Sequence, residues 1–214
     1  MANICSQNIV YYGDEAGVLR LYLWLREMES GKKTWIGELL DAAGIKDWES
    51  MDVNARGRVQ DVELLEATKE SPMGVRVGVE SKWTPSNDAL DLVAEAVCGV
   101  GDGVMKEVMV AEEPGCEIYV NTDTEGLFFK EMAVVETNDD TEYFYMGDED
   151  GDFLEYVERK TGIRCRNWDE FWSRYDDDTG NEFYRGYLKV NGYHGDPEDE
   201  LDAWFSVHRY DSTY

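Results

Sequence analysis

The sequence predicts an α+β protein built on an antiparallel sheet with helices on one face. Three observations predict this class: stretches of alternating β-branched residues recur, apolar stripes at helical spacing lie between them, and turns containing glycine or proline separate the two. Through the first part of the chain the order is strand, helix, short helix, strand, strand, helix, strand, with further strands trailing. That order is the ferredoxin-like pattern.

The first elements follow from alternation and capping. Ile4 to Tyr12 alternates and is rich in β-branched residues, which predicts the first strand. Asp14 follows the break at Gly13 and suits the N-cap of a helix from Ala16 to Met28, because its carboxylate can accept from the free N–H groups of the first turn. A second, short helix is expected from Thr34 to Ala43.

The stretch from Val75 to Cys116 shows the fold most clearly. Residues 57–67 and 75–82 both alternate and are joined by a short connection, which predicts an antiparallel hairpin. A helix from Ser86 to Cys98 follows, and Pro85 suits its first turn because the N–H that proline lacks would be unpaired there. Further strands are expected at Lys106 to Ala111, Glu117 to Asn121 and Leu127 to Val135.

A polar, turn-prone segment from Thr137 to Thr141 is the best candidate for a domain boundary. We therefore expect a ferredoxin-like α+β domain over residues 1–137 and a smaller, acidic, aromatic-rich α+β domain or extension over residues 138–214. The elements expected in the second part are a strand at 142–146, helices ending at 160 and 175, and strands at 182–190 and 201–210, with a hairpin signal at Asn191-Gly192.

Three segments carry a resemblance to a known family. They are the opening Met1 to Asn8, the Val79 to Ser86 segment with its following helix, and the turn Glu112 to Cys116. In these segments the chain resembles the YubB-like ferredoxin-like family of plasmid and phage proteins over about residues 1–137, and the tail lies outside the match. The resemblance implies an accessory gene of a mobile element. It supplies no catalytic residues to carry over.

The charge balance excludes whole classes of partner. The chain has 47 Asp plus Glu against 20 Lys plus Arg, a net charge of −27, which repels nucleic acid and anionic membrane alike. No apolar stretch approaches the roughly 20 residues that span a bilayer. The four cysteines form no closely spaced pair. We therefore expect a cytoplasmic protein with reduced thiols that binds neither nucleic acid nor membrane directly.

No motif for catalysis or for a cofactor stands out. The acidic loop around Gly151 fails the calcium-loop pattern because positions 1 and 12 would be Met146 and Val157, and the run before Gly180 lacks the distal Glu. Cys165 lies between two arginines, but a lone cysteine is usually a small core residue. We expect no catalytic, cofactor-binding or metal-binding residues and no enzymatic activity.

The second part combines its densest acidic runs with an aromatic cluster. The cluster has two interpretations: a second hydrophobic core, which is favoured, or an interface in which exposed aromatic residues anchor a partner. For the interface, the candidate partner-binding residues are Asp139, Asp140, Asp148, Glu149, Asp150, Asp152, Trp168, Trp172, Asp176, Asp177 and Asp178.

These features lead to a hypothesis about function. The chain is expected to be a non-enzymatic acidic protein of a phage or plasmid that binds a basic host protein, one that itself binds nucleic acid, as a nucleic-acid mimic of the anti-restriction or anti-CRISPR type. One alternative is an accessory or structural protein of a mobile element whose acidity serves only solubility. Another is a carboxylate-based, metal-dependent enzyme.

Overall fold

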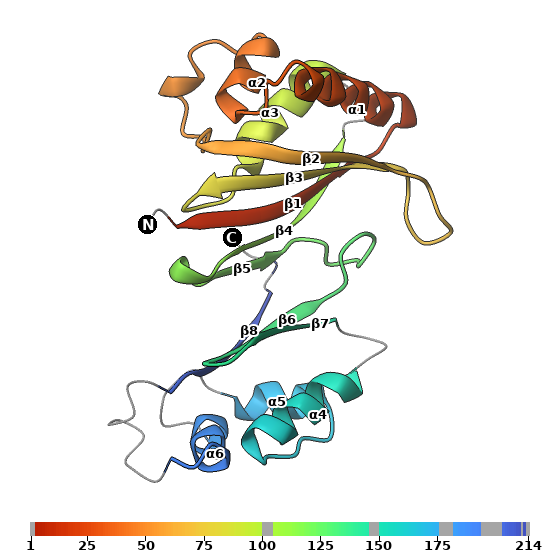
Figure 1. The fold of residues 1–214 in the computed structure, drawn as a ribbon. Helices are drawn as coiled ribbons and strands as arrows, with labels where there is room; N and C mark the ends of the chain where they lie inside the picture. The colour runs from red at the N-terminus through yellow and green to blue at the C-terminus, as the bar shows by residue number, and fades with distance from the viewer. Residues whose placement is uncertain are drawn as a thin grey trace. The chain divides into compact units, whose positions relative to one another are not determined.

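The computed structural model describes residues 3–99, 105–145, 150–175, 182–193, 203–210 and 212. The chain divides into two compact units (Figure 1): unit 1 comprises Met1–Phe129 with Asp211–Tyr214, and unit 2 comprises Lys130–Tyr210. Each unit combines an antiparallel sheet with helices, so the predicted α+β class is confirmed.

Unit 1 is built on a five-stranded antiparallel sheet in the order β2-β3-β1-β4-β5. The long strand β1 pairs with β3 on one side and β4 on the other, and the predicted hairpin of β2 and β3 is confirmed. The strands are β1 Ile4–Tyr12, β2 Gly57–Leu65, β3 Gly74–Lys82, β4 Lys106–Glu113 and β5 Ile118–Asn121.

The helices α1, α2 and α3 of unit 1 cover one face of this sheet (Figure 1). Asp14 caps α1 as expected, accepting from the backbone N–H of Gly17 at 3.0 Å. The helical elements are α1 Glu15–Ser30, α2 Ile36–Ala42, η1 Trp48–Ser50, α3 Asn87–Cys98 and η2 Pro114–Cys116.

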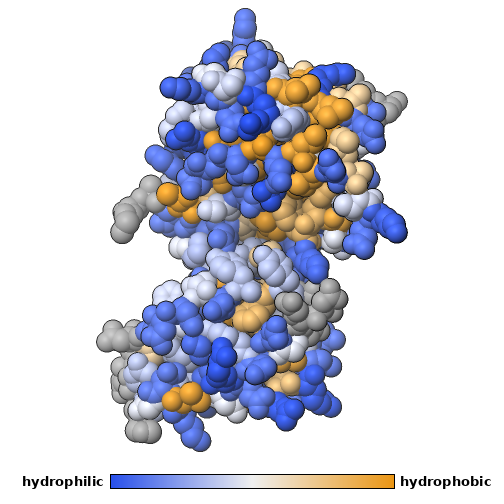
Figure 2. Space-filling view, turned by 45° about the vertical axis from the view of Figure 1, so that its right-hand side comes forward, coloured by the Kyte–Doolittle hydropathy of each residue, from blue (hydrophilic) through white to orange (hydrophobic). Residues whose placement is uncertain are grey.

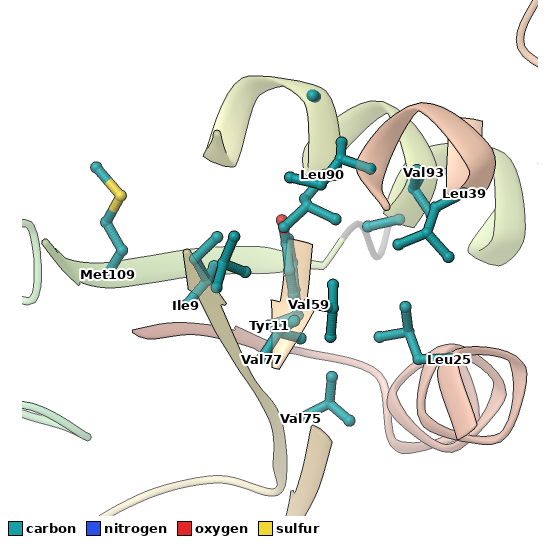
Figure 3. Packing of buried hydrophobic residues seen from close by; sticks show 14 of the residues in the cluster. Ile9, Tyr11, Leu25, Leu39, Val59, Val75, Val77, Leu90, Val93 and Met109 are labelled. Carbon is teal, nitrogen blue, oxygen red and sulfur yellow. The ribbon is translucent and has the colours of Figure 1, made fainter. Parts of the chain in front are cut away.

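The core of unit 1 lies between the sheet and these helices. Strand alternation turns Ile9 and Val77 toward the helices, where they meet Leu90 and Val93 of α3 and Leu39 of α2 (Figure 3). All five are at most 3% exposed. Burying one such side chain contributes roughly 1.5–3 kcal/mol, so this layer is the main source of stability in unit 1.

A hydrogen-bond network fixes the turn between β3 and α3. The buried amide of Gln7 donates to Ser81 Oγ at 3.1 Å and accepts from the backbone N–H of Ser86 at 3.1 Å, which ties strand β1 to the start of the helix. The amide of Asn54 donates to the carbonyl of Thr84 at 2.7 Å. The turn is therefore part of the scaffold, because its polar groups are occupied in holding sheet and helix together.

Unit 2 has a three-stranded antiparallel sheet in the order β7-β6-β8. Its helices lie on one face of that sheet (Figure 1). They enclose an aromatic core in which Phe153, Phe171 and Phe183 are fully buried. The elements are β6 Met132–Thr137, β7 Thr141–Tyr145, α4 Asp150–Thr161, α5 Trp168–Arg174, α6 Glu182–Val190 and β8 Phe205–Arg209.

Two predictions of local structure are wrong in unit 2. Residues 182–190 form helix α6 and not a strand, because Phe183, Tyr184, Tyr187 and Leu188 repeat at helical spacing and all are buried. The expected hairpin at Asn191-Gly192 is instead the end of α6, where Gly192 has φ +80°.

The strand expected from Leu127 begins only at Met132. The reason is the carboxylate of Asp123, which accepts from the backbone N–H groups of Leu127, Phe128 and Phe129 at 3.1, 2.6 and 2.9 Å. Because these N–H groups are occupied by a side chain, they are not available for sheet pairing.

Two helical glycines provide a matched test of packing in unit 2. A Cβ at Gly186 would lie 2.3 Å from the carbonyl oxygen of Thr161, whereas a Cβ at Gly151 would meet nothing within 4 Å. Gly186→Ala should lower the free energy of unfolding by about 1–3 kcal/mol, because the backbone of Thr161 must move. Gly151→Ala should raise it by up to about 0.5–1 kcal/mol.

Urea denaturation of the two variants and the unmodified protein measures both changes. Equal effects of the two substitutions would contradict the close approach of Gly186 to Thr161.

Candidate functional site

Six of the eleven candidate partner-binding residues cannot be assessed in full. Asp148, Glu149 and Asp176 to Asp178 lie outside the described residues, and Asp150 is placed only as the first residue of α4. The described candidates are Asp139, Asp140, Asp152, Trp168 and Trp172, all in unit 2.

Asp140 lies in the turn between β6 and β7 and is bound within its own unit. Its carboxylate accepts from Thr137 Oγ1 at 2.6 Å and Tyr156 OH at 2.8 Å, and forms an ion pair with Lys160 Nζ at 3.1 Å. The hydrogen bond from Thr137, with those from Tyr156 and Lys160, lowers the pKa of Asp140. This residue therefore holds the turn to α4, while its neighbour Asp139 is exposed.

The two candidate tryptophans belong to the core of unit 2. Trp168 is 6% exposed, and its ring packs on Phe153 with a centroid distance of 4.5 Å. Trp172 is partly buried and meets Trp168 edge-on at 5.3 Å. The interpretation of the aromatic cluster as a second core is confirmed for these residues. Trp168 is too deeply buried to contact a partner while unit 2 stays folded.

Other aromatic residues of unit 2 are exposed. Tyr143 and Tyr145 alternate on β7 and are 44% and 50% exposed, and Trp204 is 58% exposed. Sequence reasoning missed them, although the period of two in Thr141–Tyr145 places both tyrosines opposite the partly buried Phe144. These three aromatic side chains are therefore at the surface of unit 2.

Unit 2 also has exposed carboxylates on β7 and on α4. Glu142 lies on β7 between the turn and the tyrosines, and Asp152 and Glu155 are exposed one turn apart on α4. Hydrophilic residues also dominate the visible face of both units, although a group of hydrophobic residues shows on unit 1 (Figure 2).

Several basic residues of unit 2 pair with carboxylates of the same unit. Arg174 Nε lies 2.7 Å from Glu182 Oε1, and Arg166 Nε lies 2.6 Å from Glu170 Oε2. Arg209 pairs with Glu131. These pairs lie at the surface, where the side chain of Arg166 is 86% exposed, so they leave the acidic excess of the chain unchanged.

Unit 1 contains a small cavity, lined in part by carboxylates, that composition did not suggest. It has a volume of about 120 Å³ and lies between α3, β1 and β4. Its lining residues are Tyr11, Asp91, Ala94, Glu95, Cys98, Gly99, Met105 and Glu107.

The strand register places two of the polar groups together. Tyr11 and Glu107 are directly opposite each other in the β1–β4 pair, so both side chains lie on the helix-covered face of the sheet. Asp91 comes from α3 and accepts from Tyr11 OH at 2.9 Å. Because the chain has 47 acidic residues, sequence alone could not single out Asp91 and Glu107. Alternation on β4 does place Glu107 on the inward face of the sheet with Met109.

The carboxylates of Asp91 and Glu107 differ in the hydrogen bonds that they accept. Glu107 Oε1 accepts a long hydrogen bond of 3.4 Å from Asn87 Nδ2. Glu107 Oε2 is shielded from solvent and has no hydrogen-bond partner among the described residues. A buried oxygen without a donor is costly, more so when it carries charge.

Burial disfavours the ionised form of both acids. Desolvation, reinforced by the charge of Asp91, raises the pKa of Glu107 to about 7. Desolvation, reinforced by the charges of Asp88 and Glu95, raises the pKa of Asp91 to about 6, against the hydrogen bond from Tyr11, which lowers it. Near neutral pH the cavity therefore exchanges protons with solvent.

Two further observations concern the described residues. In the described ranges, no group of three or more His, Cys, Asp or Glu side chains is arranged to hold a metal ion. The helices among the same residues are too short or too polar to cross a membrane.

Comparisons with known proteins add no relative. Family models, curated proteins and solved structures were all compared with this chain, and none matches.

The raised pKa of Glu107 predicts a pH-dependent stability. A carboxyl group whose pKa is higher in the folded than in the unfolded protein stabilises the fold at low pH, and that stabilisation is lost as pH rises through the folded value. The loss for Glu107 should fall between its ordinary pKa of 4.5 and about 7. Glu107→Gln should remove this dependence and be more stable than the unmodified protein above pH 7, by on the order of 2 kcal/mol.

Urea denaturation from pH 4 to pH 8 measures the difference between the two proteins. Glu66→Gln, at an exposed loop residue, is the matched control and should keep the pH dependence of the unmodified protein. If the free energy of unfolding changes with pH in the same way in Glu107→Gln and in the unmodified protein, ionisation of Glu107 does not destabilise the fold.

Proposed function

We propose that this protein is a non-enzymatic, acidic interaction protein that binds the basic nucleic-acid site of another protein. The observation that carries the proposal is the excess of carboxylates, 47 against 20 cations. A duplex presents one negative charge per roughly 1.7 Å of axis, and a site built to bind that charge array can also bind exposed carboxylates.

The acidic excess remains after the surface ion pairs are counted. Arg166, Arg174 and Arg209 each pair with a glutamate of the same unit, and such exposed pairs offset only part of the acidity. A partner would therefore meet carboxylates such as Asp139 and Asp152, which are exposed.

The exposed aromatic residues of unit 2 supply the second part of such an interface. Carboxylates at a rim speed association and set specificity, but most of the affinity of an interface comes from a few anchors, which are often Trp and Tyr. Tyr143, Tyr145 and Trp204 are about half exposed and lie in the same unit as the exposed acids. The two tyrosines are on the face of β7 turned away from α4, because Phe144 between them packs on Phe153 of that helix. We assign them the anchoring role that sequence reasoning gave to Trp168 and Trp172.

The fold of unit 1 bears on the origin of the protein. Its chain order, β1, α1, α2, β2, β3, α3, β4, and its strand order, β2-β3-β1-β4, support a ferredoxin-like class for this unit. With the resemblance to YubB-like proteins, this favours an accessory protein of a phage or plasmid. The natural targets of such a protein are nucleases of host defence, either restriction or CRISPR effectors.

Capture and competition together test the proposal. The immobilised protein should retain a basic, nucleic-acid-binding protein from a bacterial lysate at low salt and release it as salt rises, because exposed charges are screened within about 10 Å at 0.1 M. The purified target should then lose labelled duplex DNA when the protein is added. Capture of no such protein, or simultaneous binding of DNA and this protein to the target, would refute mimicry.

Substitution of the proposed anchor residues on β7 tests whether this strand belongs to the interface. The double variant Tyr143→Ala/Tyr145→Ala should weaken binding to the captured target at least about tenfold, since truncating an aromatic hot spot costs 2 kcal/mol or more. Trp35→Ala is the matched control, because Trp35 is 55% exposed but lies in unit 1. An unchanged affinity of the double variant would remove β7 from the interface.

A further inference from the structure

A group of basic residues lies at one end of the five-stranded sheet of unit 1. Arg56 immediately precedes β2, Arg58 is the second residue of this strand, and Lys82 ends β3. The backbone N–H of Lys82 donates to the carbonyl of Arg56 at 3.0 Å, so the two residues are neighbours across the strands. Val59 points into the core, so alternation places Arg56 and Arg58 on the face of the sheet away from the helices. All three basic residues are exposed.

Two exposed tryptophans border these cations. Trp35 forms an antiparallel bridge with Arg58, which turns both side chains to the same side, and Trp83 directly follows Lys82. Trp35 is 55% exposed and Trp83 is 49% exposed. In the described part of the chain, neither indole ring packs on another aromatic ring or on a cation. We call these two tryptophans, with Arg56, Arg58 and Lys82, the basic corner.

The carboxylates of the chain do not neutralise the basic corner. Arg76, on the same face of the sheet, pairs with Glu63 at 2.6 Å. Among the described residues, however, no ion pair involves a cation of the basic corner, although the chain has 47 acidic residues. Glu80, which is opposite Arg58 in the strand register, accepts instead from Gln60 Nε2 at 2.7 Å. The net charge of the chain therefore conceals a local group of unpaired cations.

The backbone of Trp83 supports a role for its ring. This residue has φ +72°, in the left-handed region that a bulky side chain rarely adopts and that glycine adopts without cost. Residues in such conformations persist only where the surrounding structure maintains them, and they cluster at binding sites. The turn thus holds an exposed indole at a position that its backbone conformation disfavours.

We propose that the basic corner binds a short segment of single-stranded nucleic acid, with bases on the indole rings of Trp35 and Trp83 and phosphates at Arg56, Arg58 and Lys82. Every base has a face that stacks on an aromatic ring, and the planar guanidinium group donates to a phosphate through two parallel N–H groups. Exposed indole rings beside cations favour bases over the side chains of an acidic peptide. This site lies in unit 1 and does not depend on the proposed interface of unit 2.

The net charge of −27 limits such binding but does not prevent it. Exposed charges are largely screened beyond about 8 Å at physiological salt, so the groups in contact with the ligand decide whether it binds. A duplex keeps its bases stacked inside and offers the basic corner only phosphates. The proposal therefore replaces the expectation, drawn from net charge alone, that the chain binds no nucleic acid directly.

NMR of the indole N–H groups of the ¹⁵N-labelled full chain tests the site. On titration with the hexanucleotide (dT)₆ at physiological salt, the signals of Trp35 and Trp83 should shift and saturate. The signal of Trp204, which is 58% exposed but lies in unit 2, should stay in place. If neither Trp35 nor Trp83 responds, or if Trp204 responds equally, the proposed site does not exist.

Three control ligands separate stacking with phosphate binding from simpler attraction. Tripolyphosphate has the charge without the bases, a duplex of the same length hides its bases, and the peptide Asp-Phe-Asp-Phe-Asp has charge and rings without nucleotides. Each should bind at least about tenfold more weakly than (dT)₆ if bases and phosphates are both required. Equal binding of tripolyphosphate or of the duplex would overturn the role of stacking. Equal or tighter binding of the peptide would assign the surface to an acidic protein and refute the proposal.

Substitutions assign the response to the basic corner. Arg56→Gln should weaken binding of (dT)₆ about tenfold, as expected for loss of a charge-assisted hydrogen bond. Lys69→Gln removes the same charge from an exposed loop residue of unit 1 and should leave the affinity unchanged. Equal affinity in these two variants would overturn the assignment of a phosphate to Arg56.

Trp83→Gly separates binding from folding. Because glycine suits the left-handed backbone, this variant should keep its urea midpoint or raise it, while its affinity for (dT)₆ falls about tenfold. An unchanged affinity would remove Trp83 from the site. If the variant fails to fold, as judged by circular dichroism, Arg56→Gln still decides the proposal, because it changes only an exposed side chain.

Discussion

The placement of carboxylates constrains this fold, because 47 acidic side chains must each keep their water or find a donor when the chain folds. Where an acid is buried, it organises the backbone around it. Asp123 is 5% exposed and accepts from three consecutive N–H groups, those of Leu127, Phe128 and Phe129. Glu113 is 3% exposed and accepts from the N–H two residues further on, which shapes η2. Both residues are therefore structural, and neither adds charge to a surface that a partner could reach.

The two units use their remaining acids differently. In unit 2, Asp140 is held by neighbouring donors and by Lys160, while Asp139 and Asp152 stay exposed. In unit 1, the cavity keeps Glu107 Oε2 away from water without giving it a donor. An arrangement that costs stability persists in a protein only where the surrounding structure maintains it, and such groups cluster at functional sites. The exposed acids of unit 2 support the proposed recognition of a basic surface.

The sequence predicted the fold well where local signals agreed and less well where tertiary structure decided. Alternation in β1 and β3, the Asp14 cap and the apolar face of α3 gave the sheet and helices of unit 1. The helix α6 was misjudged because its aromatic residues have high β propensity, although their spacing is helical. The start of β6 depends on Asp123, which no local pattern reveals. The cavity could not be foreseen, because its carboxylates lie on α3 and β4 and meet only through the register of β1 with β4.

Among the carboxylates that the structure describes, Glu107 has an oxygen that is shielded from water and has no donor, whereas its neighbour Asp91 accepts from Tyr11. Titration of the individual carboxyl groups, followed by ¹³C NMR of the side-chain carbons, measures this most directly. The account predicts a pKa of about 7 for Glu107 and about 6 for Asp91, with Asp140 below its usual range. A Glu107 that titrates near its ordinary pKa of 4.5 would contradict this interpretation, because its carboxylate would then be neither desolvated nor short of a partner.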